Sequence, residues 1–305
     1  MLPVPLDLAG ILPPVATPFV DDEVDLAAMR ANCERWMRTG LRGILLLGTN
    51  GEAPLIRDEE AVRLVAAARE AVPADRVLLV GTGRQATRDV IALSRDVARA
   101  GADAVLVLTP SVYRNQLTPS ALIAHYRAIA DGSPVPVVLY NMPQATGVTL
   151  TPAIVQELAS HPNIAGIKES SGDVAVVGDL VARAPSGFPV VVGAAASLYA
   201  SLMVGATGGI VAVANVVPDL CVRLYELARG GRHEEALALQ RALSPLASAV
   251  TTGYGVPGLK AAMAVAGYWP GQPRRPLVAL DDDARRKIGV LFDALSTRAE
   301  ALTVS

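Results

Sequence analysis

Lysine is rare in this chain, and one lysine stands in an unusual place. Of the 27 Lys and Arg residues, only Lys168, Lys260 and Lys287 are lysines. Lys168 ends a short apolar run, Ile164-Ala-Gly-Ile-Lys, whereas the other two lie in segments with a helical pattern. A primary amine can lose its proton and add to a carbonyl, which a guanidinium cannot do. Lys168 is therefore a candidate Schiff-base lysine, although most lysines simply meet solvent.

Other residues with useful chemistry also follow apolar runs. Tyr140 is the second-to-last residue of the run 136–141, and a phenol beside an amine can transfer protons while a carbinolamine forms and loses water. A rim tyrosine that only hydrogen-bonds to the backbone is the equally simple alternative. The turn Gly48-Thr49-Asn50-Gly51 can direct N–H groups and a hydroxyl towards a carboxylate. Glu52 follows this turn and precedes a helix, so we expect it to accept from backbone donors or an Arg rather than act as a base.

The elements that must position these residues alternate regularly. Apolar runs rich in Val, Leu and Ile are typical of parallel strands covered on both faces, and there are eight: Ile11–Thr17, Gly43–Thr49, Val77–Gly83, Ala104–Thr109, Pro136–Asn141, Ile164–Ser170, Pro189–Ala194 and Gly208–Asn215. Helical segments intervene, among them Asp25–Thr39, Asp58–Ala71, Thr87–Ala100 and those that begin at Thr118-Pro119 and Thr151-Pro152. This alternation predicts an α/β fold, a (β/α)8 TIM barrel. An open doubly wound sheet is the alternative, but no GxGxxG turn follows an early strand.

The pattern changes after Pro218. Four helical segments follow it: Asp219–Arg229, His233–Val250, Pro257–Ala266 and Asp282–Leu295. No linker composition separates them from the alternating part. We therefore predict one structural unit, with a barrel over residues 1–218 and a C-terminal helical extension over residues 219–305 packed on it.

Composition excludes several classes of function. The net charge is −2 and the pI is about 6.0, which leaves no basic footprint for nucleic acid or an anionic membrane. The cysteines, Cys33 and Cys221, lack CxxC spacing, and the histidines, His125, His161 and His233, lack the spacing of metal ligands. No apolar run reaches the ~20 residues of a membrane span, and the first residues lack a basic signal-peptide region. We expect a cytoplasmic protein without a metal site.

In a barrel of this kind the active site lies at the carboxyl ends of the strands. The motifs at those ends, taken together, resemble the dihydrodipicolinate synthase / N-acetylneuraminate lyase superfamily: Gly48-Thr-Asn-Gly-Glu52, Gly81-Thr-Gly83, Tyr140-Asn-Met-Pro143, Gly166-Ile-Lys-Glu-Ser170 and Gly193. The resemblance extends from about residue 10 to 295. It implies a (β/α)8 barrel, usually a homotetramer, that performs class I aldolase or lyase chemistry on 2-oxo acids with no cofactor beyond the covalent imine.

The resemblance also implies roles for individual residues. Lys168 would form the imine, and Tyr140 would transfer protons. Thr49 would bind the carboxylate of a pyruvate-type acid and relay protons, and Tyr113 would reach this relay from a neighbouring subunit. The positions that would bind substrate are Thr49, Asn50, Gly51, Ser170, Gly193 and Ile210.

Two departures bear on the substrate. The synthases have a second Thr where this chain has Asn50. They also carry an arginine two residues after the proline of the tyrosine motif, where it binds the carboxylate of aspartate semialdehyde, and here that residue is Ala145. Losing a guanidinium removes a bidentate carboxylate partner. Within the superfamily the chain is most similar to 4-hydroxy-2-oxoglutarate aldolase, with which it also shares Ser170 and the segment Gly255-Val-Pro-Gly-Leu-Lys260.

Three functions follow as hypotheses. The first is cleavage of a 4-hydroxy-2-oxoglutarate-type acid to pyruvate and glyoxylate. The second is the synthase reaction, which condenses pyruvate with aspartate semialdehyde. The third is a barrel that binds a 2-oxo acid without turning it over. The partner in each case is a small 2-oxo acid. The motifs contain no cationic side chain that would bind a distal carboxylate. Asn50 and Ser170 could form hydrogen bonds with such a carboxylate but could not neutralise its charge.

Overall fold

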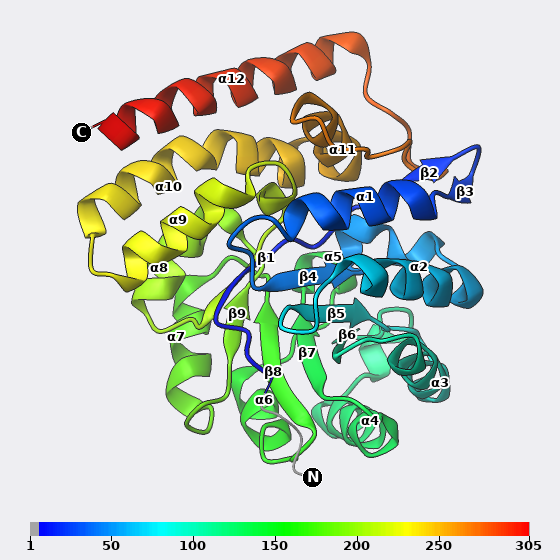
Figure 1. Ribbon diagram of the computed structural model, residues 1–305. Coiled ribbons are helices and arrows are strands. Elements are labelled where there is room, and N and C mark those ends of the chain that lie inside the picture. The colour runs from blue at the N-terminus through cyan, green and yellow to red at the C-terminus, as the bar shows by residue number, and fades with distance from the viewer. Residues whose placement is uncertain (1–5, 305) are drawn as a thin grey trace.

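A computed structural model describes residues 6–304 of the 305-residue chain, so residues 1–5 and 305 of the predicted barrel and extension lie outside it. Within the described residues, eight parallel strands form one sheet in the order β1-β10-β9-β8-β7-β6-β5-β4. The strands are β1 (Gly10–Leu12), β4 (Gly43–Leu46), β5 (Val77–Gly81), β6 (Ala104–Leu108), β7 (Val137–Asn141), β8 (Ile164–Glu169), β9 (Val190–Val192) and β10 (Gly208–Ile210). A parallel bridge between Pro14 and Leu45 joins the two edges, so the sheet closes into the predicted barrel (Figure 1).

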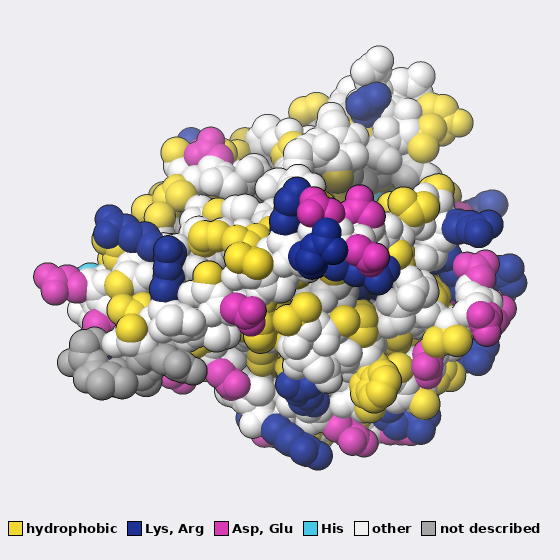
Figure 2. Space-filling model, turned by 90° about the horizontal axis from the view of Figure 1, so that it is seen from above, with side chains coloured by type: hydrophobic (Ala, Val, Ile, Leu, Met, Phe, Trp, Pro, Cys, Tyr) yellow, Lys and Arg dark blue, Asp and Glu magenta, His cyan; other side chains and the backbone are white. Residues whose placement is uncertain are grey.

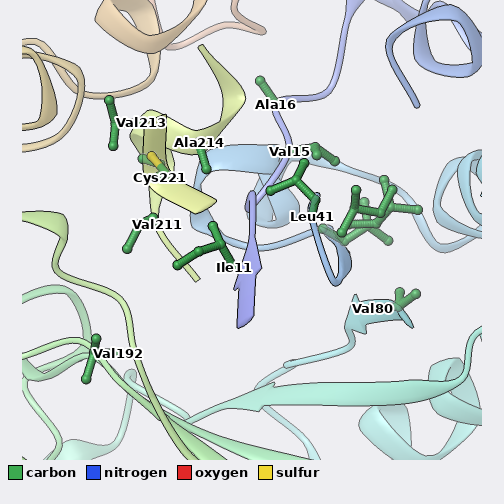
Figure 3. Packing of buried hydrophobic residues seen from close by; sticks show 14 of the residues in the cluster. Ile11, Val15, Ala16, Leu41, Val80, Val192, Val211, Val213, Ala214 and Cys221 are labelled. Atoms are coloured by element: carbon green, nitrogen blue, oxygen red, sulfur yellow. The ribbon is translucent and has the colours of Figure 1, made fainter. Parts of the chain in front are cut away.

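The apolar runs form strands because both faces of the sheet are covered. Alternate side chains point into the barrel, where a compact cluster includes Leu45, Leu106 and Tyr140. The other side chains point outward and pack under the helices in a larger cluster. Figure 3 shows part of this outer cluster, to which β1, the segment after β10 and a later helix each contribute.

Helices follow the strands and surround the barrel (Figure 1). They are α1 (Leu26–Trp36), α2 (Asp58–Ala71), α3 (Thr87–Arg99), α4 (Pro119–Gly132), α5 (Pro143–Thr146), α6 (Pro152–Leu158), α7 (Val174–Arg183) and α8 (Leu198–Met203). Thr118 and Thr151 act as predicted, because each side chain accepts a hydrogen bond from the backbone N–H three residues later, with proline in the first helical position.

The C-terminal helices are α9 (Pro218–Arg229), α10 (His233–Ser248), α11 (Gly255–Val265) and α12 (Asp282–Val304). Helix α12 runs alongside α10 and α11 on the outside of the molecule (Figure 1). It continues past the predicted end at Leu295, since the sequence there holds neither Gly nor Pro to stop it. The extension thus lies on the barrel as a layer of helices.

All eight strands are shorter than the predicted apolar runs, and the first and last differ most. The run Ile11–Thr17 yields only β1, because Pro13 and Pro14 have no N–H group to continue a ladder. The run Gly208–Asn215 yields β10 and then a 3₁₀ turn over Ala212–Asn215. The sequence also gave no sign of a two-residue antiparallel hairpin, β2 (Phe19–Val20) with β3 (Glu23–Val24), which is too short for a periodic signal.

Among the described residues, no helix has the length and apolar character needed to cross a membrane. Figure 2 shows one face of the molecule, on which the side chains of Lys and Arg alternate with those of Asp and Glu instead of gathering by sign.

Candidate functional site

Lys168 and Tyr140 lie side by side on neighbouring strands. The register of β7 and β8 pairs Tyr140 with Lys168, and both side chains point to the barrel interior. Lys168 Nζ lies 4.2 Å from the centre of the Tyr140 ring. The two residues are only 3% and 4% exposed, respectively. The barrel therefore brings the predicted amine and the predicted phenol together, shielded from bulk water.

A bulge in β8 determines this orientation. Val137 pairs with Ile164, but Val138 pairs with Gly166, so one extra residue stands between the two pairs. Ile164 faces the outer cluster, and strict alternation from it would turn Lys168 outward as well. The extra residue shifts the alternation by one and turns Lys168 inward instead.

Thr49 reaches the same place from the end of β4, three strands away from β7 in the sheet. It begins the 3₁₀ turn Thr49–Gly51 after β4, and its Oγ1 lies 3.4 Å from the Tyr140 hydroxyl. Both hydroxyls also donate to the sulfur of Met142, at 3.5 Å from Thr49 and 3.1 Å from Tyr140. Methionine sulfur is a weak acceptor, so both hydroxyls can exchange it for a better partner on a ligand.

Thr49 and Tyr140 line a cavity of about 450 Å³, which is within the usual range for small-molecule sites. Ala145 lines it too, at the position where the synthases carry an arginine. Lys168 is not part of the lining, but it lies against the ring of Tyr140, which is.

Gly193 and Ser170 pack tightly beside the lysine. A Cβ atom on residue 193 would lie 1.9 Å from Ser170 Oγ and 3.2 Å from Lys168 Cε, so this close approach requires glycine. Ser170 Oγ is buried and has no hydrogen-bond partner among the described residues. A buried hydroxyl without a partner is unfavourable, and a bound ligand could supply one.

The ends of β7 and β8 are held by a second pair that the sequence did not reveal. Asn141 Nδ2 donates to Glu169 Oε2 at 2.6 Å, and Asn141 Oδ1 accepts from the N–H of Leu150 at 2.9 Å. Glu169 Oε1 accepts from the N–H of Ser171 at 2.5 Å. Since Asn141 and Glu169 each follow a site residue, this pair fixes the strand ends that carry Tyr140 and Lys168.

The other residues predicted for the site differ in burial and in whether they line the cavity. Ile210 belongs to the interior cluster that contains Tyr140. Gly51 is buried, and its carbonyl accepts from Thr17 Oγ1 at 2.7 Å, whereas Asn50 is half-buried and does not line the cavity. Tyr113 is 70% exposed on the loop after β6, so a single chain does not bring it to the Thr49–Tyr140 pair.

Glu52 is held inside the protein by the C-terminal extension. Its Oε1 lies 2.7 Å from Lys260 Nζ, and its Oε2 accepts from the N–H of Arg274 at 2.8 Å. Lys260 Nζ also donates to the carbonyls of Thr17 and Gln272. Burial lowers the pKa of Lys260 and the Glu52 carboxylate opposes that shift. Glu52 is thus structural, as expected, but its cation is a lysine rather than an arginine.

No group of three or more His, Cys, Asp or Glu residues that could hold a metal ion occurs among residues 6–304. His125 is buried on α4, and its Nδ1 lies 2.8 Å from Thr87 Oγ1. Burial lowers the pKa of His125 to about 4.

Comparison with known proteins identifies the family of this chain. The profile of the dihydrodipicolinate synthetase family matches residues 7–295. This chain belongs to that family. A 4-hydroxy-tetrahydrodipicolinate synthase of Exiguobacterium is 36% identical over 280 residues, which cover 92% of this chain and 95% of the synthase. A probable mitochondrial 4-hydroxy-2-oxoglutarate aldolase of Emericella nidulans is 37% identical over 276 residues, which cover 88% of this chain and 89% of the aldolase.

Solved structures of the dihydrodipicolinate synthetase family have the same fold. YagE, a prophage protein of Escherichia coli K12 crystallised with pyruvate, superimposes with a TM-score of 0.89 at 30% identity and covers 95% of this chain and 99% of its own. The 4-hydroxy-tetrahydrodipicolinate synthase of Methylacidiphilum fumariolicum superimposes with a TM-score of 0.91 at 29% identity, covering 97% and 99%. Both the fold and the recognition of the aldolase and lyase family from sequence are confirmed.

Proposed function

We propose that this family member is a class I aldolase that cleaves 4-hydroxy-2-oxoglutarate-type acids to pyruvate and glyoxylate through an imine on Lys168. The observation that carries the proposal is the pairing of Lys168 with Tyr140 inside the barrel, with 4.2 Å between the amine and the ring centre. No metal or other cofactor takes part in the proposed reaction, because the protonated imine itself withdraws electrons.

The reaction follows from the chemistry of the amine. Lys168 Nζ adds to the C2 ketone, and the carbinolamine loses water to give a protonated imine. Removal of the proton from the 4-hydroxyl lets the C3–C4 electron pair move into the imine, which releases glyoxylate and leaves an enamine. Protonation of the enamine at C3 and hydrolysis of the imine release pyruvate. Tyr140 is the proposed proton carrier for these steps, with Thr49 Oγ1 3.4 Å away as its relay.

The other site residues have proposed binding roles. The turn of Thr49, Asn50 and Gly51 would receive the C1 carboxylate of the 2-oxo acid. Ser170 Oγ, which is buried without a partner among the described residues, would donate to the bound acid. Gly193 leaves the space this requires, and Ile210 provides an apolar wall below the ketone.

The synthase reaction is the alternative, and several synthases are as similar to this chain as the aldolase is. We favour the aldolase because Ala145 lines the cavity where an arginine would bind the carboxylate of aspartate semialdehyde. If the chain is an aldolase, replacing Ala145 by Arg will raise its low synthase activity. Strong synthase activity in the unmodified protein would instead favour the alternative.

We also propose a homotetramer in the cytoplasm, within which Tyr113 of one subunit completes the proton relay of another. The exposure of Tyr113 in the single chain supports an intersubunit role. The barrel of residues 1–218 and the extension of residues 219–305 would act as a single unit, because Lys260 and Arg274 of the extension hold the turn that carries Thr49.

Borohydride trapping with pyruvate tests the proposal. Mass spectrometry of the digested protein should locate a stable adduct on Lys168 and on no other lysine. Lys168→Ala, with an unfolding transition like that of the wild type, should form no adduct and cleave no substrate. Absence of an adduct in folded wild-type protein would contradict the aldolase and the synthase together. Trapping of pyruvate without turnover of any aldol substrate would favour a barrel that only binds 2-oxo acids.

A further inference from the structure

A dicarboxylic substrate has a second carboxylate, and the sequence motifs contain no cationic side chain that would bind it. The cavity that contains Thr49 and Tyr140 is apolar over much of its wall, where Ile56, Leu106 and Leu108 contribute. A carboxylate buried against such a wall without a cation is strongly disfavoured. The structure must therefore provide a positive group, or the protein must reject dicarboxylic substrates.

Arg84 is the one residue with an ionised side chain among the described residues that line this cavity. It follows β5, on the loop that leads into α3. Its neighbour Gln85 holds this loop in place, since Gln85 Oε1 accepts from the N–H groups of Ser111 and Val112 at 3.0 and 3.1 Å. Arg84 thus lies on a loop that is hydrogen-bonded to the neighbouring loop after β6.

The contacts of Arg84 leave part of its guanidinium available. Nε and Nη2 donate to the same oxygen of Asp58, at 3.1 and 2.7 Å, and Nη1 donates to the carbonyl of Gly83 at 2.9 Å. A guanidinium has five N–H groups. Two remain, one on Nη1 and one on Nη2, and neither has a partner among the described residues. A carboxylate can accept from one N–H on each outer nitrogen of a guanidinium, so these two groups suffice to bind one.

We infer that Arg84 binds the distal carboxylate of the substrate and selects dicarboxylic 2-oxo acids over monocarboxylic ones. This inference rests on the proposed function, since it assigns the C1 end of the substrate to Thr49 and the imine to Lys168. Arg84 performs the task of the arginine that Ala145 replaces, but from a different strand of the barrel. Asp58, at the start of α2, orients the guanidinium without occupying these two N–H groups.

Imine trapping with a matched pair of acids tests the inference without requiring turnover. 2-Oxoglutarate and 2-oxopentanoate have chains of equal length and differ in the terminal group, which is a carboxylate in one and a methyl in the other. The concentration of each acid that gives half-maximal borohydride trapping on Lys168 is measured. In the wild type we expect 2-oxoglutarate to be the better ligand.

Arg84→Gln should weaken trapping of 2-oxoglutarate about 10- to 100-fold, the range for losing hydrogen bonds to a charged group, and leave 2-oxopentanoate and pyruvate nearly unchanged. Arg84→Lys should give an intermediate loss, because it keeps the charge but not the fork. Arg88→Gln is the control. It removes an arginine from α3 whose side chain is 90% exposed and outside the cavity.

The outcomes separate the inference from the function on which it rests. If Arg84→Gln weakens both five-carbon acids equally, or neither, while pyruvate is still trapped on Lys168, the inference is wrong and the proposed function stands. If wild-type protein traps no 2-oxo acid on Lys168, both fail. An unfolding midpoint of Arg84→Gln near that of the wild type excludes a general loss of structure as the cause.

Discussion

Lys260 Nζ lies 2.7 Å from Glu52 Oε1, and both side chains are almost completely buried, with exposed fractions of 3% and 0%. The two residues are far apart in the sequence. Glu52 directly follows the turn that carries Thr49, and Lys260 belongs to α11 of the extension. This ion pair thus holds the helical extension against the mouth of the barrel, next to the turn that is proposed to bind the carboxylate.

Removing one partner should therefore be costly. Lys260→Met leaves the Glu52 carboxylate buried without its cation, and we expect unfolding in urea to show a loss of about 3–5 kcal/mol. The double variant Glu52→Gln/Lys260→Met removes both charges of this pair and should be more stable than the single variant. If the double variant loses as much as the two single changes added together, the ion pair is not the source of the effect.

Gly193→Ala should greatly slow pyruvate trapping in a protein that still folds. The new Cβ would lie 1.9 Å from Ser170 Oγ and 3.2 Å from Lys168 Cε, so the lysine must move. We expect the trapping rate to fall at least about 100-fold, as small displacements of catalytic groups do. Adding Ser170→Gly removes the nearest obstacle, so the double variant should recover towards the rate of Ser170→Gly alone. If the double variant stays far below Ser170→Gly alone, the clash with Ser170 is not the cause.

Tyr140→Phe should keep the packing of the ring and remove the hydroxyl that is proposed to transfer protons. Among the described residues, the Tyr140 hydroxyl hydrogen-bonds only to Thr49 Oγ1 and the sulfur of Met142, so its removal breaks no hydrogen bond to the backbone. We expect kcat/KM for aldol cleavage to fall about 10²- to 10⁴-fold, the usual contribution of a general acid or base. Tyr126→Phe is the matched control. Its buried hydroxyl donates to the carbonyl of Val107, so this change should lower stability but not the rate.

The free energy of unfolding should decrease at acidic pH, because His125 is buried. Burial lowers its pKa to about 4, below the ordinary 6.5. Between these values the unfolded chain binds a proton that the folded protein does not, so stability is complete above pH 6.5 and falls as the pH drops towards 4. The full loss is on the order of 3 kcal/mol. Urea unfolding at pH 7.5 and 5.0 should show this slope in the wild type and in His161→Gln, and a smaller slope in His125→Gln.

Dilution should reveal whether Tyr113 acts between subunits. If it completes the relay of a neighbouring chain, specific activity will fall as the protein is diluted below the dissociation constant of the assembly. Sedimentation at the same concentrations should show the oligomer dissociate in parallel. Constant specific activity across dissociation, or full activity of Tyr113→Phe, would remove this residue from the site.

The sequence was sufficient to predict the barrel and the Lys168–Tyr140 pair for a common reason. Parallel strands that are covered on both faces leave continuous apolar runs, and the residue that ends each run lies at the barrel mouth. The prediction that Lys168 and Tyr140 fall at such ends needed no knowledge of their contacts. Their inward orientation, however, depends on the bulge between Ile164 and Gly166, which the spacing of apolar residues does not reveal.

The contacts that hold the site could not be predicted, because they join distant parts of the chain. Nothing near Glu52 in the sequence points to Lys260, and nothing near Asn141 points to Glu169. The position of Arg84 in the cavity could not be predicted from the sequence for a different reason. It is one of 24 arginines, since 27 basic residues include three lysines, and only the shape of the cavity distinguishes it from those on the surface.

The three lysines of this chain also divide by accessibility. Lys168 and Lys260 are each 3% exposed, whereas the side chain of Lys287 on α12 is 63% exposed. Among the three lysines, reagents that acylate amines in the folded protein should therefore modify only Lys287, on the outer helix of the extension. A fluorophore attached there leaves the buried amine of Lys168 free, so each chain can carry one lysine label without first removing competing lysines.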